Sequence, residues 1–320
     1  MEFVLCPFCG ESGESNLMWK IPDRLWFPDC YFNLVRCNRC AFVYLNPRPD
    51  DKEMERHYPS FDHSSAIYPK VTPSAFLWRI RQIESRKKGG KLLDVGCGNG
   101  FFLAFALERN WDGYGLDNSP SAIQAARQKL GDRVTLTTLS EACYPSDSFD
   151  VVSLFEVLEH VPNPMDHLRE IHRILKPGGW ACVSVPNFAS LERLVFRRWW
   201  VGLDAPRHLQ QFTPKSLHFF LKESGFDAVD VRSINADKIQ MMKHAITYSQ
   251  ESFRYLLRDF GLYPQKIVPT AEEFPAMENE QPAAWKKGIH WLEWMVFYPF
   301  CLLARSLDKD NTLWAWGRKP

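Results

Sequence analysis

The sequence has no uninterrupted apolar run approaching the ~20 residues of a membrane-spanning helix. Its first residues, MEFVLCPFCG, also lack the basic segment and apolar stretch of a secretory signal peptide. With 39 basic and 38 acidic residues the formal net charge is only +1, so the chain as a whole is not drawn toward nucleic acid or an anionic membrane. These absences predict a cytoplasmic protein and disfavour a secreted or membrane-spanning one.

Apolar and aromatic residues, by contrast, are plentiful. The chain has 320 residues, of which 45% are hydrophobic and 14% aromatic, including 12 tryptophans. This is enough for one large domain with a small one beside it, or for two domains. The nine cysteines of an unsecreted chain favour free thiols or a metal site over disulfides.

Four cysteines form two CxxC pairs, Cys6 with Cys9 and Cys37 with Cys40. Each pair can present two thiolates from a tight turn, and together they complete a closed, tetrahedral zinc site. A segment as small as 1–50 has little core of its own, so the metal would supply much of its folding energy. We interpret the segment as a structural zinc ribbon.

Two roles remain open for this ribbon. Zinc ribbons often bind nucleic acid, but basic and aromatic residues are not concentrated here, which favours a structural clip beside the substrate entrance. A redox role is disfavoured because there are two pairs and no thioredoxin-like setting. Cys30 lies between the pairs without a partner and is not predicted to be a ligand.

Residues 51–90 combine a linker rich in proline and charge with a helical run around Ala75 to Arg86. The basic residues of this region are predicted to form a solvated face: Arg79, Arg81, Arg86, Lys87 and Lys88.

From Lys91 onward, apolar strands alternate with amphipathic helices, which predicts a parallel sheet covered on both faces. The first strand runs into a turn with three glycines and a helix that begins at Phe101. Such a turn lets the backbone approach a ligand closely, and the helix start directs unpaired N–H groups at it. The later elements are predicted as strands 113–117, 134–138, 149–155, 180–185 and 228–233, a helix from Pro120, a helix 165–175 and a turn 176–179.

The chain from 234 to 311 is far too long for an ordinary connection between two strands. It contains helix-like runs at 239–257 and 284–307, separated by a proline-containing stretch at 264–275. We predict a helical insert or lid, followed at 312–320 by an antiparallel last strand.

The motifs LLDVGCGNG, GLD, FDVVSLFEVLEH and ILKPGG occur in this order over roughly residues 90 to 235. In combination they resemble the class I S-adenosylmethionine-dependent methyltransferases, and the N-terminal half resembles the subgroup with a CxxC…CxxC ribbon followed by NPRP. The resemblance implies an α/β fold with a doubly wound, seven-stranded, mostly parallel, Rossmann-like sheet. The implied division is a zinc ribbon at 1–50, a linker and helical segment at 51–90, a cofactor-binding core at 91–233, the insert, and the last strand.

S-adenosylmethionine needs different partners for its amino-acid end, ribose and adenine. Asp94 is expected to face the ammonium group, Asp117 the ribose hydroxyls, and Asn118 the adenine edge. Many relatives place an acid where this chain has Thr138, so Glu141 or the backbone near Leu139 and Ala142 is expected to substitute. The full predicted cofactor set is Asp94, Gly96, Cys97, Gly98, Gly100, Asp117, Asn118, Leu139, Glu141 and Phe155.

The predicted chemistry lies at Glu156, Glu159 and His160, at the carboxyl edge of the sheet. The E-x-x-E-H pattern resembles the ubiquinone-pathway O-methyltransferases, in which these residues are associated with a divalent cation. A bound Mg²⁺ there would lower the pKa of a phenol. The alternative is that these residues hold the loop and the cofactor side.

His208 lies in a segment that resembles the helix capping the substrate pocket in relatives. We predict catalytic roles for His208, His160 and Glu159, with His208 as general base. A structural or substrate-positioning role for His208 stays open. Tyr58 and Tyr68 are further residues that can reach a pocket.

The run Trp291–Ala304 is dense in large apolar side chains. It favours a buried or dimer-forming helix, with a lid for a lipid-like acceptor or a peripheral membrane anchor as the alternative.

The predicted function is an S-adenosylmethionine-dependent methyltransferase acting on a small or lipid-linked acceptor, at oxygen. Carbon methylation of a nucleotide-linked sugar is the close alternative, since similar ribbon-containing relatives are associated with sugar modification. An RNA methyltransferase, disfavoured by the charge balance, and a non-catalytic cofactor-binding scaffold are the other classes considered.

Overall fold

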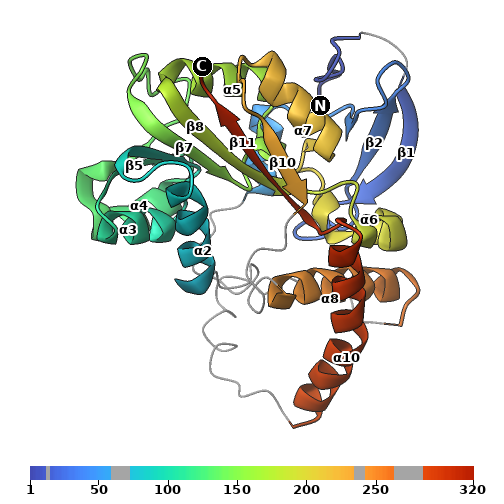
Figure 1. The fold of residues 1–320 in the computed structure, drawn as a ribbon. Helices are drawn as coiled ribbons and strands as arrows, with labels where there is room; N and C mark the ends of the chain where they lie inside the picture. The colour runs from blue at the N-terminus through green and yellow to red at the C-terminus, as the bar shows by residue number, and fades with distance from the viewer. Residues whose placement is uncertain (12–14, 59–72, 234–241, 263–283) are drawn as a thin grey trace.

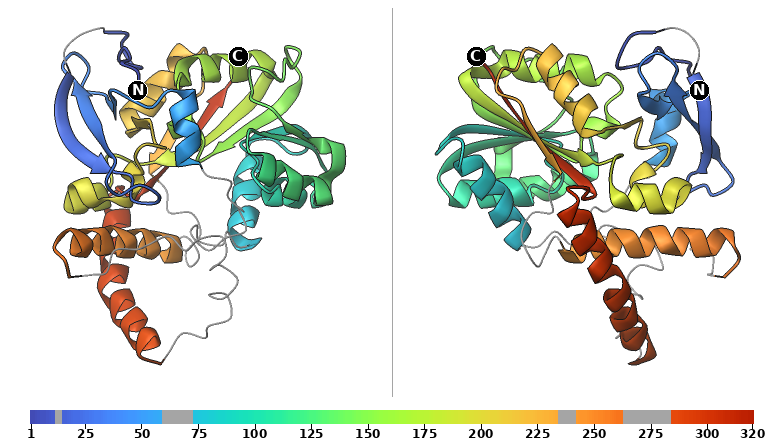
Figure 2. Two further views of the ribbon diagram at one scale, coloured as in Figure 1. Left: turned by 180° about the vertical axis from the view of Figure 1, so that it is seen from behind. Right: turned by 45° about the vertical axis from the view of Figure 1, so that its right-hand side comes forward.

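The computed structural model describes residues 1–11, 15–58, 73–233, 242–262 and 284–320. A seven-stranded sheet forms its centre, a smaller antiparallel sheet lies beside it, and two long helices extend from one end (Figure 1). Both termini lie at the opposite end of the molecule from those helices (Figures 1 and 2).

The large sheet has the strand order β10-β11-β8-β7-β4-β5-β6. All pairs from β8 to β6 are parallel, and β11 runs antiparallel to both of its neighbours. The prediction of a seven-stranded, mostly parallel sheet with an antiparallel last strand is therefore confirmed. The strands are β4 (Gly90–Val95), β5 (Trp111–Asp117), β6 (Val134–Leu136), β7 (Phe149–Phe155), β8 (Leu175–Pro186), β10 (Asp230–Ser233) and β11 (Thr312–Arg318).

Alternating apolar side chains bury both faces of this sheet. Leu92 packs with one set of helices, whereas its neighbour Leu93 packs with the other. The first face carries α2 (Pro73–Glu84), α3 (Phe101–Glu108) and α4 (Pro120–Leu130), and the second carries α5 (Pro164–Ile174) and α7 (Pro214–Glu223) (Figures 1 and 2). The sheet is doubly wound, as the alternating pattern predicts.

The smaller sheet, called the N-terminal sheet below, has the order β1-β2-β3-β9. Its first three strands are β1 (Ser15–Pro22), β2 (Tyr31–Cys37) and β3 (Val43–Leu45). The fourth, β9 (Gln210–Gln211), comes from the other half of the chain and pairs with β3, with Tyr44 opposite Gln210. The N-terminal sheet is thus completed by a segment of the central domain, the part of the chain that forms the seven-stranded sheet and its helices.

The insert before the last strand is helical where the structure describes it. Helix α8 (Met242–Asp259) packs against α10 (Ala284–Ser306), with the rings of Phe253 and Phe297 5.9 Å apart. The predicted proline-containing stretch lies outside the described residues. The remaining short helices are α1 (Asp51–Met54), α6 (Leu191–Phe196), η1 (Glu55–His57), η2 (Gly131–Arg133), η3 (Leu158–His160), η4 (Arg197–Trp199) and η5 (Val201–Leu203).

Helix α10 is buried on one face and exposed on the other. Phe297, Cys301 and Ala304 lie in the core, whereas Val296 and Leu303 are 66% and 51% exposed. In α10, the side chains of residues 284–294 lie outside the described part of the structure. In the part of the chain that the structure describes, none of the helices has the length and apolar character needed to cross a membrane.

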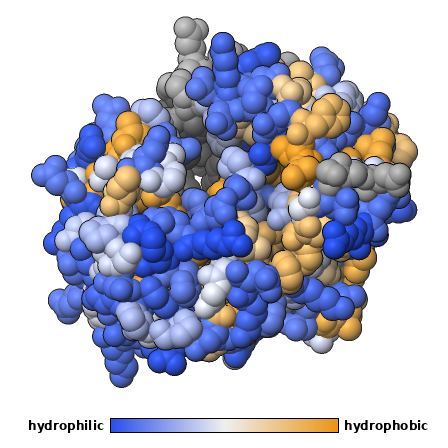
Figure 3. Space-filling model, turned by 90° about the horizontal axis from the view of Figure 1, so that it is seen from above, coloured by the Kyte–Doolittle hydropathy of each residue, from blue (hydrophilic) through white to orange (hydrophobic). Residues whose placement is uncertain are grey.

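The surface at the end of the molecule opposite to α8 and α10 is mainly hydrophilic (Figure 3). Figure 3 shows this end, where hydrophilic residues cover most of the described surface and hydrophobic ones gather in separate patches.

The predicted turn at Lys176–Gly179 is wrong, because these residues belong to β8. The pairing of β7 with β8 shifts register between Phe149 and Val151, which accommodates the extra residues. Gly178 has a left-handed backbone, φ 76°, and a side chain at Gly179 would meet the Lys176 carbonyl at 2.8 Å. Proline and glycine therefore mark an irregular strand here instead of its boundary.

Candidate functional site

The direction of the strand order reverses at β4, which has β5 on one side and β7 on the other. In open α/β sheets, ligands collect at the carboxyl ends of the strands that flank such a reversal. Asp94, Asp117 and Phe155 lie at or next to the carboxyl ends of β4, β5 and β7. The fold therefore gathers the main predicted cofactor residues at one edge.

The glycine turn after β4 requires glycine at three positions. Gly96, Gly98 and Gly100 all have left-handed backbones, with φ of 71°, 53° and 73°. A side chain on Gly96 or Gly100 would collide with Val157 or Leu130, whereas nothing lies within 4 Å of the Cβ position of Gly98. Gly98 is therefore the glycine whose side faces open space, as a ligand-facing residue requires.

Asp117 fixes this turn. Its Oδ2 accepts a hydrogen bond from the Gly98 amide at 2.9 Å, and its Oδ1 accepts one from the Ser119 amide at 2.8 Å. A carboxylate oxygen has two lone pairs, so both oxygens keep acceptor capacity for ribose hydroxyls.

Asp94 is almost completely buried, with 4% of its surface exposed. Its Oδ1 accepts a hydrogen bond from the Ser153 hydroxyl at 2.7 Å. Burial raises the pKa of Asp94 to about 7, although Ser153 and Arg79 oppose the shift. A cationic ligand group would stabilise the ionised form of this carboxyl, which fits the ammonium group of the cofactor.

The remaining predicted cofactor residues divide into exposed and packing positions. Glu141 is exposed, and its carboxylate accepts hydrogen bonds from the amide and hydroxyl of Thr138, at 3.1 and 2.7 Å. Asn118 is exposed too. By contrast Leu139, Cys97 and Phe155 are buried members of the core. Their side chains belong to the hydrophobic core beneath the predicted cofactor site.

The prediction that the basic residues around α2 form one solvated face is wrong for two of them. The Arg79 guanidinium lies 4.6 Å from the centre of the Phe155 ring, and burial lowers its pKa while Glu156 and Asp94 oppose this. Arg86 pairs with Asp230 at 2.8 Å. Because α2 packs on the sheet, its long cationic side chains can reach over aromatic rings toward strand ends.

A second group of functional side chains lies beyond the end of β7. Glu159 and His160 belong to η3, and His208 follows η5. The Nε2 atoms of His160 and His208 each lie 3.9 Å from Glu159 Oε1, and the two ring centres are 4.7 Å apart. The structure thus brings together the three residues predicted to be catalytic.

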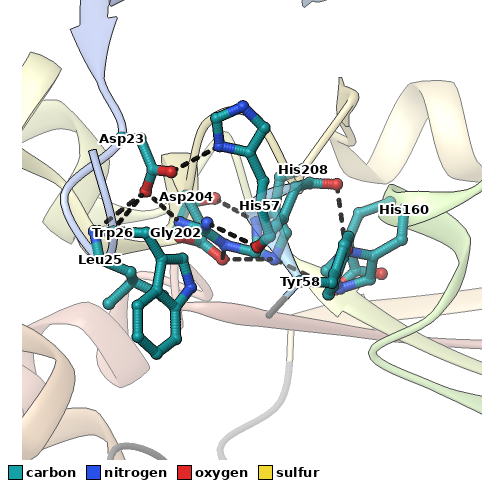
Figure 4. A network of polar contacts seen from close by, with 11 residues as sticks. Asp23, Leu25, Trp26, His57, Tyr58, His160, Gly202, Asp204 and His208 are labelled. Atoms are coloured by element: carbon teal, nitrogen blue, oxygen red, sulfur yellow. Dashed lines mark hydrogen bonds and ion pairs between the residues drawn. The ribbon is translucent and has the colours of Figure 1, made fainter. Parts of the chain in front are cut away.

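Both imidazoles are held through Nδ1 (Figure 4). His208 Nδ1 lies 2.8 Å from the Gly202 carbonyl, and His160 Nδ1 lies 3.1 Å from the Arg207 carbonyl. A carbonyl can only accept, so each Nδ1 carries the hydrogen, and in the neutral form of either ring the lone pair is on Nε2, the nitrogen near Glu159. Burial, together with His208, lowers the pKa of His160 to about 3, so this ring is neutral.

Glu159 is 1% exposed, and neither carboxyl oxygen has a hydrogen-bond partner among the described residues. Burial and the neighbouring Glu156 raise its pKa well above the usual range. A buried carboxyl without partners is costly unless a proton, substrate group or cation completes its environment. Glu159 is therefore the clearest sign of a ligand in this part of the chain.

The predicted cation set of Glu156, Glu159 and His160 does not match the group that the structure forms. Among the described residues, the ligand atoms that lie within 4.8 Å of one another here belong to Glu159, His160 and His208. Glu156 instead accepts a hydrogen bond from the Ser184 hydroxyl at 2.8 Å. Its left-handed backbone, φ 58°, turns the chain out of β7, and its carboxyl stays close enough to Glu159 to raise the pKa of that residue.

Sequence reasoning did not rank Tyr58 and did not identify Arg207. The Tyr58 hydroxyl lies 2.9 Å from His160 Nδ1, and Arg207 supplies the carbonyl that holds the same nitrogen. Proximity to His208 in the sequence was a signal for Arg207, whereas nothing local indicated Tyr58. Tyr68 lies outside the described residues.

The four paired cysteines meet in space. The sulfur atoms of Cys6 and Cys40 are 3.5 Å apart, those of Cys9 and Cys37 are 3.7 Å apart, and all four lie within 4.8 Å of one another. Tetrahedral zinc with Zn–S bonds of ~2.3 Å places sulfurs roughly 3.8 Å apart, so the cluster fits this ion. Cys30 is exposed and lies outside the cluster, as expected.

The thiols of this cluster differ in their acidity. Burial raises the pKa of Cys6 to about 11. Burial acts in the same direction on Cys37, but the amides of Cys40 and Arg39 outweigh it and lower the pKa to about 7.

Comparison with known proteins agrees with this geometry. A family model described as a methyltransferase domain matches residues 72–231. Two curated relatives are both named ubiquinone biosynthesis O-methyltransferase. The one from Alkalilimnicola ehrlichii is 28% identical over 54% of this chain and 70% of its own length. The one from Idiomarina loihiensis is 33% identical over 41% of this chain and 54% of its own length.

A third relative of the same name, from Thiobacillus denitrificans, is 31% identical over 45% of this chain and 63% of its own length. The matches thus span between 54% and 70% of the length of these three relatives. Among solved structures, a Haemonchus contortus phosphoethanolamine N-methyltransferase 2 in complex with S-adenosyl-L-methionine shares the fold. Its TM-score is 0.51 at 18% identity, over 78% of this chain and 54% of that one. The chain therefore belongs to the S-adenosylmethionine-dependent methyltransferases of the methyltransferase-domain family.

Proposed function

We propose that this methyltransferase acts on a hydroxyl group of a small molecule. The observation that carries the proposal is the cluster of the buried Glu159 with the partly buried His160 and His208, at the same sheet edge as the glycine turn. It offers ring nitrogens with free lone pairs and a carboxyl with unsatisfied oxygens, which suit a polar acceptor bearing an exchangeable proton. The names of the curated relatives favour oxygen as the acceptor atom.

Asp94, the glycine turn and Asp117 are the residues proposed to hold S-adenosylmethionine, which supplies an activated methyl group when bound. Asp94 is placed for the ammonium group, because it is a buried carboxyl whose charge needs a cation. Asp117 is placed for the ribose hydroxyls, with the Gly98 backbone beside it. Asn118 and Glu141 are exposed at the expected adenine side.

His208 is the proposed general base. Its Nδ1–H is held by the Gly202 carbonyl, so Nε2 is free to accept the hydroxyl proton of the acceptor. The acceptor oxygen then forms a bond to the methyl carbon as the bond from carbon to sulfur breaks. The products are the methyl ether and S-adenosylhomocysteine, and the proton stays on His208. His160 and Glu159 are proposed to orient the acceptor.

A divalent cation is the second candidate for the same three side chains, favoured by the unsatisfied oxygens of Glu159. Two imidazoles and one carboxylate suit a transition metal better than the predicted Mg²⁺, which prefers oxygen ligands. The carbonyls at each Nδ1 would orient the rings as such partners do in metal sites. Equilibrium dialysis against Mn²⁺ tests this candidate, with Glu159→Gln and His160→Ala expected to abolish binding.

The test of the proposed function is a search for the acceptor. Methyl-labelled S-adenosylmethionine is incubated with phenols and catechols, with and without alkyl chains, and separately with nucleotide sugars and RNA. We expect label in a phenolic ether that survives mild base. Exclusive labelling of a sugar carbon or of RNA would overturn the proposal and support those alternatives.

His208→Ala tests the catalytic assignment once an acceptor is found. Turnover should fall about 100-fold or more while S-adenosylhomocysteine still binds, because the histidine lies on the acceptor side. His218→Ala is the matched control, since His218 is exposed on α7 and far from the cluster in the fold. Equal turnover of both variants would refute the assignment.

We further propose that the exposed face of α10 meets the apolar part of a lipid-linked acceptor at a membrane surface. Val296 and Leu303 are the residues to test, whereas Phe297 is unsuitable because it is buried against Phe196 and Phe253. Wild-type protein should pellet with anionic vesicles, and Val296→Asp with Leu303→Asp should not. A wild-type protein that stays in the supernatant while forming homodimers through this helix would contradict membrane contact.

A further inference from the structure

The loop that carries His208 is joined to the N-terminal sheet on both sides of the histidine. After His208, the Leu209 carbonyl accepts a hydrogen bond from the Leu45 amide at 2.9 Å, and β9 then pairs with β3. The Leu209 amide donates to the Glu159 carbonyl at 2.8 Å. One residue thus links the N-terminal sheet to η3 within the proposed acceptor site.

Before His208, Arg207 forms the second connection. Arg207 is 2% exposed and donates from Nη2 to Asp23 Oδ1 at 3.1 Å. Asp23 follows β1 and is fully buried, and its Oδ2 accepts from His57 Nδ1 at 2.7 Å. The same oxygen that meets Arg207 also accepts from the Leu25 and Trp26 amides. Asp23 is thereby held rigidly by its own strand end.

Arg207 has a second acidic partner in its own loop. Its Nε and Nη2 donate to the two carboxylate oxygens of Asp204 at 3.0 and 2.6 Å. Burial would raise the pKa of Asp204, but the charge and hydrogen bonds of Arg207 outweigh it and lower the pKa to about 2. A guanidinium that bridges a buried carboxylate and a partly buried one is held in one orientation, because its donors form a planar fork.

The backbone of Arg207 is what places the two catalytic imidazoles. Its carbonyl accepts from His160 Nδ1, and its peptide bond leads directly into His208. The His208 amide in turn donates to the Asp204 carbonyl at 3.0 Å. Any rotation of Arg207 would therefore change the position of both rings.

We propose that Asp23 is a positioning residue of the methyl-transfer site and acts through Arg207 on His208 and His160. The four-cysteine segment and its sheet are then part of the acceptor side of the active centre, and not an independent module. This inference rests on the proposed function for its activity readout, but not for its structural one.

The test uses full-length protein with ¹⁵N-labelled histidine and bound S-adenosylhomocysteine. Asp23→Asn and Arg207→Lys should each move the ring ¹⁵N signals of His160 and His208 away from the pure Nδ1–H form. S-adenosylhomocysteine affinity should stay within about twofold, and turnover of the acceptor found above should fall about tenfold or more, as small displacements at a reacting centre do. Arg24→Gln is the matched control, since Arg24 also bridges the N-terminal sheet to the core, through the Arg198 carbonyl.

A double-variant cycle separates positioning from mere stabilisation. In a His208→Ala background, Asp23→Asn should cause little further loss, whereas a purely structural role gives losses that multiply. If Asp23→Asn loses zinc or the N-terminal sheet, Arg207→Lys decides, because it leaves Asp23 and His57 intact. Unchanged ring signals in both variants would overturn the inference, even if no acceptor has been found. Changed ring signals without any methylated acceptor would instead count against the proposed function alone.

Discussion

Asp94 is the residue whose acidity should be visible in cofactor binding. Its pKa is raised to about 7 by burial, so near neutral pH part of the population is protonated before the cofactor binds. Because an ammonium group favours the carboxylate, affinity for S-adenosylhomocysteine should rise from about pH 6 to about pH 8 and then level off. Well below the pKa the change approaches about tenfold per pH unit, and it becomes smaller near the pKa itself.

Isothermal titration calorimetry in buffers of different ionisation enthalpy would detect the proton released on binding at low pH. Asp94→Asn should bind weakly and without this pH dependence. A pH-dependent affinity in Asp94→Asn would mean that another group titrates.

Single residues also show how far the sequence leads. Asp94 and Asp117 were identifiable because strand ends can be located from local apolar patterns, and the fold brings such ends together. The partnership of Glu159 with His208 was not identifiable, since it depends on how a loop after η5 folds back on η3. The same reason hides Asp23 and Arg207, whose contact joins distant parts of the chain.

At the scale of elements, a substitution in the turn between β4 and α3 can distinguish the effect of backbone strain from the effect of blocking a ligand. Gly98→Ala introduces a side chain into open space at φ 53°, so unfolding free energy should fall by only about 1 kcal/mol. The methyl group nevertheless projects toward the proposed cofactor, and S-adenosylhomocysteine affinity should fall about tenfold or more.

Gly131→Ala provides the matched control for this turn. Gly131 has φ 57° and no atom of the described residues within 4 Å of its Cβ position, and it caps the carboxyl end of α4, where no predicted cofactor residue lies. It should lose at least as much stability in urea unfolding with no change in affinity, because its ψ of −133° lies in a region that alanine rarely adopts. Equal affinity losses in both variants would show that strain alone explains the Gly98 effect.

The contact between α6 and α8 contains a buried acid. Glu192 is 3% exposed and accepts a hydrogen bond from Ser249 at 2.6 Å, and burial raises its pKa to about 7. The folded state therefore binds this proton more tightly than the unfolded chain, so the contribution of Glu192 to stability falls as pH rises from about 4.5 to about 7.

Glu192→Gln should consequently stabilise the protein by roughly 1 to 3 kcal/mol at about pH 8 and by little at about pH 5. Urea unfolding at the two pH values measures the difference. Glu223→Gln, at an exposed position of α7, should show no such pH dependence. A stabilisation that is equal at both pH values would exclude the titration of Glu192 as its cause.

The irregular start of β8 shows why some element boundaries escape prediction. Lys176-Pro-Gly-Gly179 has the composition of a turn, yet it lies inside β8 as an irregular segment between Leu175 and Trp180, which both pair with β7. Arg79 shows that the solvated face of a helix is equally hard to predict, because its guanidinium lies over the Phe155 ring. Tertiary packing, which local composition does not encode, decided both cases.

At the scale of the whole molecule, the four-cysteine cluster should couple metal content to stability. Cys37→Ser should release about one zinc per chain, measured by elemental analysis, and lower the Tm of the N-terminal sheet, because Cys37 ends β2. S-adenosylhomocysteine should still bind, since none of its proposed residues belongs to the cysteine cluster or the N-terminal sheet. Cys30→Ser, at an exposed cysteine outside the cluster, should change neither quantity.

Full zinc content in Cys37→Ser would contradict a four-thiolate site. The overall architecture was well predicted, because alternating strands and helices indicate a parallel sheet and the resemblance to the methyltransferases implied seven strands with an antiparallel last one. The pairing of β3 with β9, by which the N-terminal sheet takes a strand from the central domain, follows from neither of these and could not be predicted from the sequence.

That borrowed strand sets an order of events during synthesis. Residues 15–45 leave the ribosome early, but β9 at Gln210–Gln211 is made only after most of the central domain. Until then the edge of β3 is unpaired, and closing so long a loop carries a large entropic cost. The nascent N-terminal sheet therefore stays incomplete until its last strand has been made. Stalled chains that end before Gln210 should be protease-sensitive in this sheet, while chains that extend past the ribosomal tunnel beyond β11 should not.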